Sequence, residues 1–150
     1  MRTLALALLP VIAGLLAASC TSTRSTTTTK AAPPRLPRYR EPFTSAPPCP
    51  RKPATTLDIE GCAERDIIRT DAAIEARARA VFSLLNPKGR REFVIAERSW
   101  LAYRKASCSV GASKYAGGTL EPVAFGLCVA KKNRSHLEEL SALGRDLRGP

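Results

Sequence analysis

The sequence predicts an all-α protein whose folded part is a small antiparallel three-helix bundle held together by two disulfides. Three observations support this fold class in a chain of 150 residues. Apolar residues recur at spacings of three and four in three separate stretches. Short or glycine-rich segments separate these stretches, which favours antiparallel neighbours. Four cysteines lie within or beside the same region.

The first expected helix begins just after Thr55. Thr55 and Asp58 form a capping-box pattern, which satisfies backbone N–H groups that have no partner at a helix start. The apolar stripe that follows predicts one buried face and consists of Ile59, Ala63, Ile67, Thr70, Ile74, Ala78, Val81 and Leu85. Residues 86–89, Asn-Pro-Lys-Gly, end this helix and turn the chain.

Two further helices are expected after this turn. The second has one face made of Phe93, Ala96, Trp100, Tyr103 and Ser107. Residues 109–120 contain three glycines and are expected to form a loop. Pro122 suits the first turn of the third helix, which we expect to end near Gly144. Its stripe consists of Val123, Leu127, Ala130, Arg134, Leu137 and Leu140.

The expected core is small. Its large side chains are Phe82, Phe93, Trp100, Tyr103 and Phe125. A domain of about a hundred residues is marginally stable on apolar burial alone. A disulfide contributes about 2–4 kcal/mol, mainly by restricting the unfolded chain. We therefore expect the cysteines to be structural.

Cysteine usage indicates an oxidising compartment. The five cysteines are Cys20, Cys49, Cys62, Cys108 and Cys128. If a lipid modifies Cys20, the remaining four form an even set that predicts two disulfides. No CxxC motif occurs and there is one histidine, which disfavours a zinc or redox site. All four are expected at one end of the bundle, so three pairings are open, and folding kinetics favour the local pairs, 49 with 62 and 108 with 128.

The N-terminus predicts export. Residues 4–18 are apolar, a run shorter than the roughly 20 residues that a membrane span needs, so residues 1–19 are interpreted as a signal peptide. Small residues precede Cys20 and resemble a bacterial lipobox, although Ala17 stands where leucine is usual. The prediction is a lipoprotein with palmitate on Cys20, held at the outer face of the cytoplasmic membrane or at the outer membrane. Cleavage without lipidation, and an uncleaved anchor, are the alternatives.

Residues 20–48 are expected to be a disordered tether. They are rich in Thr, Ser and Pro, and they show neither helical nor strand periodicity. The folded domain is therefore expected to cover residues 49–150. The formal charge of +11 suggests anionic partners in the envelope, such as polymers or head groups, while export argues against nucleic acid. A solubilising surface rich in arginine explains the same charge.

Residues 100–108, Trp-Leu-Ala-Tyr-Arg-Lys-Ala-Ser-Cys, carry a resemblance to a known family. They resemble the WxxYRxxxC signature of the LprI-type lysozyme-inhibitor domain family. Cys49 with Cys62, Asp71, and Arg134 followed by Leu137 fit the same pattern in order, whereas Ile74-Glu75 replaces the usual Leu-Asn. The resemblance covers residues 49–150 and implies an envelope protein that binds a lysozyme-like enzyme.

Two arginines of the family-like segments have two readings. Arg134 interrupts the apolar stripe of the third helix, where an unpaired charge is costly. We expect Arg134 to pack inward and to pair with an acid, Asp71 first and Glu97 second, and Arg104 to help lock the bundle. The alternative is that Arg104 and Arg134 are presented to a ligand.

The sequence contains no pattern typical of an enzyme. His136 has no nucleophile near it in a motif, and we expect it to be a solvated helix residue. No catalytic residue, metal or cofactor is predicted. The prediction is a non-enzymatic binding module of the envelope, whose partner is an anionic polymer, a lipid or a protein. The alternative is an inhibitor of lysozyme-like cell-wall hydrolases, with the Lys114-Tyr115 loop entering the cleft.

Overall fold

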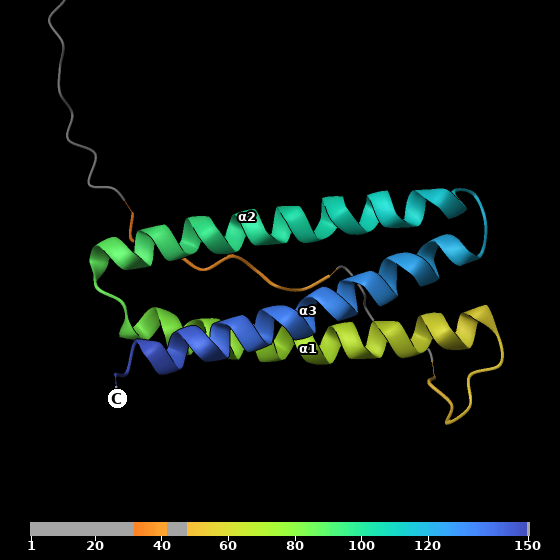
Figure 1. The fold of residues 1–150 in the computed structure, drawn as a ribbon, viewed down its shortest axis with the longest axis horizontal. Helices are drawn as coiled ribbons and strands as arrows, with labels where there is room; N and C mark the ends of the chain where they lie inside the picture. Colours follow the sequence, from red (N-terminus) through yellow and green to blue (C-terminus); the bar gives the residue numbers. More distant parts are fainter. Residues whose placement is uncertain (1–31, 42–47, 150) are drawn as a thin grey trace, which may run out of the picture. The chain divides into compact units, whose positions relative to one another are not determined.

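The computed structural model describes residues 32–41 and 48–149. Within these ranges it contains three long helices, α1 (Thr56–Leu84), α2 (Pro87–Ala112) and α3 (Leu120–Asp146), and no strand. α1 and α3 run in the same direction, and α2 runs antiparallel to both (Figure 1). The predicted all-α, antiparallel three-helix bundle is confirmed.

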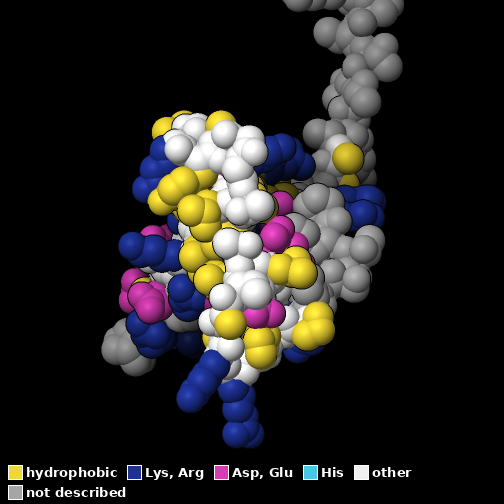
Figure 2. Space-filling model, turned by 90° about the vertical axis from the view of Figure 1, so that its right-hand side faces the viewer, with side chains coloured by type: hydrophobic (Ala, Val, Ile, Leu, Met, Phe, Trp, Pro, Cys, Tyr) yellow, Lys and Arg dark blue, Asp and Glu magenta, His cyan; other side chains and the backbone are white. Residues whose placement is uncertain are grey.

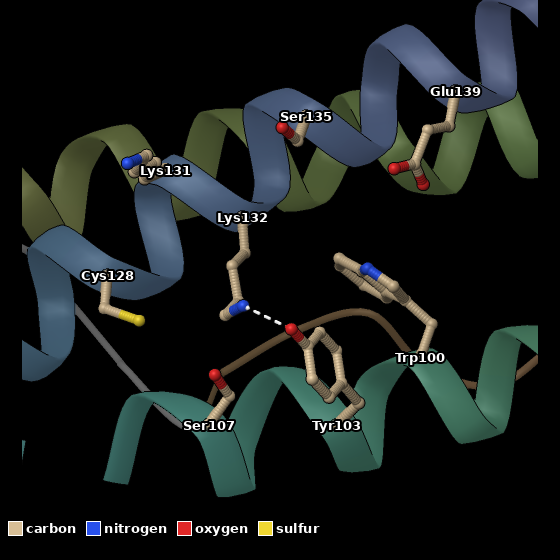
Figure 3. Close-up of a pocket in the computed structure, with 8 residues that line it drawn as sticks. All are labelled: Trp100, Tyr103, Ser107, Cys128, Lys131, Lys132, Ser135 and Glu139. Atoms are coloured by element: carbon tan, nitrogen blue, oxygen red, sulfur yellow. Dashed lines mark hydrogen bonds between the residues drawn. The ribbon is translucent and has the colours of Figure 1, made fainter. Parts of the chain in front are cut away.

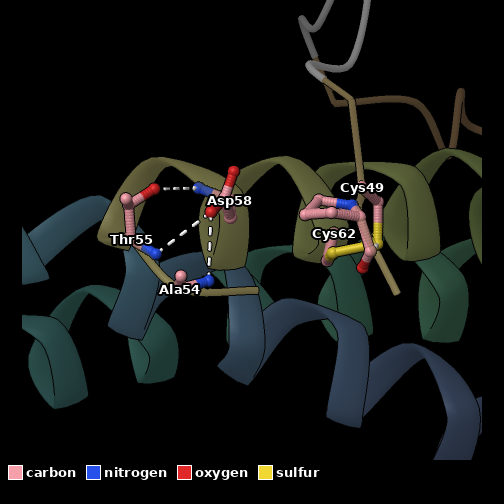
Figure 4. Close-up of a disulfide and its surroundings, with 6 residues drawn as sticks. Cys49, Ala54, Thr55, Asp58 and Cys62 are labelled. Atoms are coloured by element: carbon pink, nitrogen blue, oxygen red, sulfur yellow. Dashed lines mark hydrogen bonds between the residues drawn. A yellow bond between two sulfur atoms is a disulfide. The ribbon is translucent and has the colours of Figure 1, made fainter. Parts of the chain in front are cut away.

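Side-chain caps set the starts of α1 and α2. The Thr55 hydroxyl accepts a hydrogen bond from the backbone N–H of Asp58 at 3.1 Å, and the Asp58 carboxylate accepts one from the N–H of Thr55 at 3.0 Å (Figure 4). This is the predicted capping box. Asn86 caps α2 by accepting from the N–H of Gly89 at 2.8 Å, and Pro87 follows in the first turn.

The expected loop over residues 109–120 is shorter in the structure. α2 continues to Ala112, a short 3-10 helix, η1 (Ser113–Tyr115), follows it, and α3 begins at Leu120. The chain reverses at Gly117, whose φ of 76° lies in the left-handed region that suits glycine. Gly111 lies inside α2, because a single glycine costs a helix only about 1 kcal/mol.

α1 and α3 pack closely along each other, whereas α1 and α2 hardly touch. A Cβ atom placed on Gly126 of α3 would lie 3.2 Å from the Cβ of Ala63, so this glycine lets the two backbones approach. Ile67, Cys108, Val129 and Ala130 form a buried cluster at this end of the bundle.

The space between α1 and α2 is occupied by residues 33–41, which we call the docked segment (Figure 1, orange trace). Tyr39 is fully buried in a cluster with residues of all three helices, namely Ile74, Ala78, Val81, Phe93 and Leu140. The prediction that residues 20–48 form only a disordered tether is therefore wrong for the docked segment. Proline-rich chain has no periodicity, but one tyrosine at the right place buries enough surface to anchor it.

Two disulfides join Cys49 to Cys62 and Cys108 to Cys128. The partners are 13 and 20 residues apart, so the expected local pairing is confirmed. The first ties the chain before α1 to that helix (Figure 4). The second joins the end of α2 to the start of α3 and closes the turn between them.

The predicted buried face of α2 is rotated from the real one. Tyr103, expected in the core, is 60% exposed, and Ala96 is exposed as well. The residues that α2 buries are Phe93, Val94, Glu97, Arg104, Cys108 and Ala112. Two of these are charged, so a search for apolar periodicity placed the face one step away. Leu127 of α3, predicted in a buried stripe, is also exposed.

The predicted signal peptide and Cys20 lie outside the described residues. Within the described ranges, no helix has the length and apolar character needed to cross a membrane.

Candidate functional site

Arg104 lies at the centre of a buried polar network and is only 3% exposed. One terminal nitrogen donates to Asp71 at 2.8 Å and to the side-chain oxygen of Asn133 at 2.6 Å. The other donates to the Glu41 carboxylate at 2.6 Å. Glu41 belongs to the docked segment, and its backbone N–H also donates to Asp71 at 3.1 Å. Arg104 thus joins α1, α2, α3 and the docked segment.

Asn133 completes this network from α3. Its amide nitrogen donates to Asp71 at 2.8 Å and to the Thr70 hydroxyl at 2.9 Å. Thr70 in turn donates to the backbone carbonyl of Asp66 at 2.7 Å. Asp71 therefore accepts from three different parts of the chain, which is how a buried carboxylate is normally satisfied.

A second buried network surrounds His136. Its two ring nitrogens lie 3.0 Å from a Glu97 oxygen and 3.1 Å from a Glu139 oxygen. The Tyr39 hydroxyl donates to the same Glu97 oxygen at 2.9 Å. Burial, and then the charge of Glu97, raise the pKa of Tyr39 above its ordinary value, so its proton stays on the hydroxyl.

The pKa of His136 is raised above its ordinary value. Burial is the largest influence and acts to lower it, but hydrogen bonds and charges from Glu97 and Glu139 together outweigh burial. The expectation that His136 is a solvated helix residue is wrong, because the side chain is buried.

Trp100 connects the two networks. Its ring stacks on the ring of His136 with a centroid distance of 3.8 Å, and the Arg104 guanidinium lies 5.1 Å from the Trp100 centroid. The structure thus places the half-buried Trp100 beside the buried pair of Arg104 and Asp71, and together with His136 these side chains connect α1, α2 and α3.

Arg134 lies elsewhere, and the prediction that it packs inward on Asp71 is wrong. Its side chain is 53% exposed and pairs with Asp66 of α1. The buried face of α3 passes through Asn133 and His136, each one position before a residue of the predicted stripe. Glu97, the second expected partner of an arginine, instead accepts from Tyr39 and pairs with His136.

Sequence reasoning missed five members of the networks. Three of them, Tyr39, Glu41 and Asn133, were not singled out at all. The other two, Glu97 and His136, were named, but their contact with each other was not expected. Residues 133, 136 and 140 do follow buried Val129 at helical spacing. Reading polar residues as members of that stripe would have found two of them, whereas nothing in the sequence marks the docked segment.

One candidate contact surface is the turn between α2 and α3, residues 113–119, which we call the end turn. Lys114 is exposed, and its Nζ lies 4.8 Å from the centroid of the Tyr115 ring. The N–H of Gly117 donates to the Glu121 carboxylate at 2.8 Å, which fixes the turn on α3. The disulfide of Cys108 with Cys128 braces the helices on both sides. The end turn therefore lies between two disulfide-linked helices and carries an exposed lysine.

A second candidate surface is an open groove of about 440 Å³ between α2 and α3. It is lined by Trp100, Tyr103 and Ser107 of α2 and by Lys131, Lys132 and Ser135 of α3 (Figure 3). Lys132 donates to the Tyr103 hydroxyl at 3.2 Å, and this lysine lowers the pKa of Tyr103 below its ordinary value.

Cationic side chains are prominent on the face of the molecule drawn in Figure 2. Figure 2 shows Lys and Arg projecting around the bundle, with apolar and acidic side chains between them. In the described part of the chain, no group of three His, Cys, Asp or Glu side chains is arranged to hold a metal ion.

These features define a small disulfide-bonded helical bundle organised by buried polar networks, with one candidate contact surface at an end and another along a side. The chain belongs to the family described as lysozyme inhibitor LprI, whose model matches residues 49–140. The family resemblance of the sequence is confirmed. An uncharacterized protein of Rhizobium meliloti (strain 1021) is 26% identical over 110 residues, which cover 65% of this chain and 78% of that protein. No solved structure matches the chain.

Proposed function

We propose that this chain is an exported, lipid-anchored envelope protein that binds and inhibits a lysozyme-like cell-wall hydrolase without chemistry of its own. The observation that carries this proposal is the family match over residues 49–140, which spans all three helices up to Leu140. Two disulfides support export, because they persist in oxidising compartments.

The end turn is the element that we propose to enter the hydrolase cleft. Glycosidases of this kind place two carboxylates around the bond that they cleave. The Lys114 ammonium can pair with such a carboxylate, and the Tyr115 ring can occupy a sugar subsite. Because the disulfide of Cys108 with Cys128 already orders the flanking helices, little conformational entropy is lost on binding.

The net charge of the chain bears on the choice of target. At +11, the chain is repelled by a strongly basic hydrolase and attracted by an acidic one. Attraction between opposite charges raises the association rate more than it changes the lifetime of the complex. We therefore expect faster inhibition of hydrolases with acidic surfaces, and a stronger salt dependence for them.

An inhibition assay with the full chain tests this proposal. We expect it to slow the lysis of cell-wall suspensions by a lysozyme, and Lys114→Ala with Tyr115→Ala to weaken inhibition by about tenfold or more, as for truncation of a central interface contact. Lys88→Ala is the matched control, since Lys88 is an exposed lysine near the start of α2, at the opposite end of that helix. Absence of inhibition for acidic and basic hydrolases alike would refute the proposal. Equal weakening by Lys88→Ala would refute the assignment to the end turn.

The anchor is tested separately at Cys20. If a lipid modifies Cys20 after removal of residues 1–19, Cys20→Ala abolishes palmitate labelling and moves the protein from membrane to soluble fractions. Retention of the variant in membranes would contradict lipid anchoring while leaving the inhibition proposal intact.

A further inference from the structure

The groove between α2 and α3 offers more hydrogen-bond donors than acceptors. Lys131 and Ser135 have no hydrogen-bond or ion-pair partner among the residues that the structure describes. The indole N–H of Trp100 also makes no hydrogen bond there, and in Figure 3 it points into the groove. The one carboxylate at the edge, Glu139, is already paired with His136 at 3.1 Å. A ligand that satisfies this lining must be rich in acceptors.

The charge of the lining indicates the sign of the ligand's charge. Lys131 and Lys132 are adjacent on α3, and within the described residues the hydrogen bond and the cation–π contact of Lys132 are both with Tyr103, through its hydroxyl and, at 4.3 Å, its ring. A neutral phenol does not compensate an ammonium charge. An anion in the groove could therefore form charge-assisted hydrogen bonds to both lysines without first breaking an ion pair.

The aromatic part of the lining indicates that the ligand is more than a bare anion. Tyr103 is 60% exposed and stands beside Trp100 one helical turn away (Figure 3). The C–H face of a sugar ring packs against such aromatic surface by dispersion, while the Ser107 and Ser135 hydroxyls bond its hydroxyl or acetamido groups. The groove volume of about 440 Å³ is within the roughly 300–1,000 Å³ that small-molecule sites occupy.

We propose that the groove between α2 and α3 is a binding site for an anionic saccharide, a sugar that carries a carboxylate or a phosphate group. Lys131 and Lys132 hold the anionic group, Tyr103 contacts the ring, and the Trp100 indole N–H donates to an acceptor on the sugar. A neutral sugar leaves the two ammonium groups without a counter-charge, and an inorganic anion leaves the aromatic surface unused. The site is separate from the end turn, so this proposal does not depend on hydrolase inhibition.

The chain carries its own reporter for this site, because Trp100 is the single tryptophan in the sequence. Titration of the full chain is followed by the fluorescence of Trp100. The probes are N-acetylmuramic acid, which has a carboxylate, N-acetylglucosamine 1-phosphate, which has a phosphate, and neutral N-acetylglucosamine. We expect a saturable change with an anionic probe and at least about tenfold weaker binding of the neutral one, since a hydrogen bond to a charged group contributes this much.

Variants then locate the site. Lys131→Ala with Lys132→Ala should weaken binding of the anionic probe about tenfold or more, and Tyr103→Ala should weaken it while keeping the preference for the anion. Lys105→Ala is the control, because Lys105 is an exposed lysine of α2 that does not line the groove. Unchanged thermal melting of the lysine variants shows that they are folded.

The result with each probe is decisive. Saturable binding of the carboxylate probe alone, the phosphate probe alone, or both supports the proposal and identifies the anionic group. No saturable change with either anion, equal affinity for the neutral sugar, or full binding by the double lysine variant overturns it. The same double variant should still inhibit a hydrolase through Lys114, so the two proposals fail independently.

Discussion

The two sides of α2 differ in burial and in the contacts that their side chains make. Arg104 faces the docked segment and α1, is 3% exposed, and donates to three side chains. Tyr103, the preceding residue, faces the groove and is 60% exposed. A helix turns by about 100° per residue, so adjacent residues of one sequence signature can lie on different faces. One side of α2 holds the fold together, and the other is available for contact.

The difference explains why the buried side can contain so much charge. Arg104, Asp71 and Glu41 form one network in which each charge has an opposite partner. Within the described residues, one buried side-chain polar atom, Nε of Arg104, has no hydrogen-bond partner. Buried ion pairs of this kind add little net stability, but removing one partner is strongly destabilising.

The largest effect is therefore expected for Arg104→Met. It leaves Asp71 buried without its cation and should lower the free energy of unfolding by about 3–5 kcal/mol. Arg134→Met should change it by about 1 kcal/mol or less, because Arg134 is half exposed and Asp66 keeps a second cationic partner in Arg69. Urea unfolding of both variants checks this. A larger loss for Arg134→Met than for Arg104→Met would reverse the assignment of the two arginines.

The fold was predictable because α1 and α3 carry long stripes with few polar interruptions. The buried face of α2 was not, since Glu97 and Arg104 occupy two of its core positions. Their burial depends on partners from distant parts of the chain, Tyr39 and Glu41, which are 58 and 63 residues away. Local periodicity contains no information about such partners.

Some of the candidate sites could also be predicted from the sequence, whereas the groove could not. The cysteine pairs followed from sequence proximity, and the end turn was recognisable from its glycines. The groove was not, because Tyr103 was assigned to the core by its aromatic character. An exposed aromatic residue and a buried one have the same sequence signal, and only the rotation of the helix separates them.

The next largest effect is expected for the disulfide that supports the contact surfaces. Replacing Cys108 and Cys128 by alanine should cost about 3 kcal/mol, because the bond closes a loop of some 20 residues in the unfolded chain. The disulfide of Cys49 with Cys62 closes a shorter loop, so replacing these two cysteines by alanine should cost slightly less. Chemical unfolding of both double variants measures this. If only the replacement of Cys108 and Cys128 also weakens hydrolase inhibition, the role of this disulfide as the brace of the end turn is supported. Equal weakening by both would show that general stability, not bracing, matters.

A smaller effect is expected for Tyr39→Phe, which tests the docked segment. It removes one buried hydrogen bond to Glu97 and keeps the ring, so it should cost about 1–2 kcal/mol. Tyr103→Phe is the matched control on the other side of α2, where the hydroxyl is exposed and contacts Lys132. Thermal melts compare the two. Equal melting temperatures for Tyr39→Phe and the wild type would show that the hydrogen bond from Tyr39 to Glu97 does not stabilise the bundle.

The smallest effect is a pH dependence of stability that arises from His136 in the buried network. Glu97 and Glu139 face His136, Trp100 stacks on it, and its folded pKa is raised above the ordinary value of 6.5. A raised folded pKa means that the folded protein binds this proton more tightly than the unfolded chain. The resulting stabilisation is fully present below pH 6.5 and is lost as the pH rises through the folded pKa.

Replacing His136 by glutamine removes this titration while retaining side-chain hydrogen-bonding groups. The difference in unfolding free energy between wild type and His136→Gln should therefore be largest in mildly acidic solution and should shrink as the pH rises past neutrality. Urea unfolding at a series of pH values measures the difference. The fluorescence of Trp100, stacked on His136, should change over the same pH range in the wild type and stay constant in the variant. A difference that instead grows with pH would mean that the buried imidazole is held neutral, with burial outweighing both carboxylates.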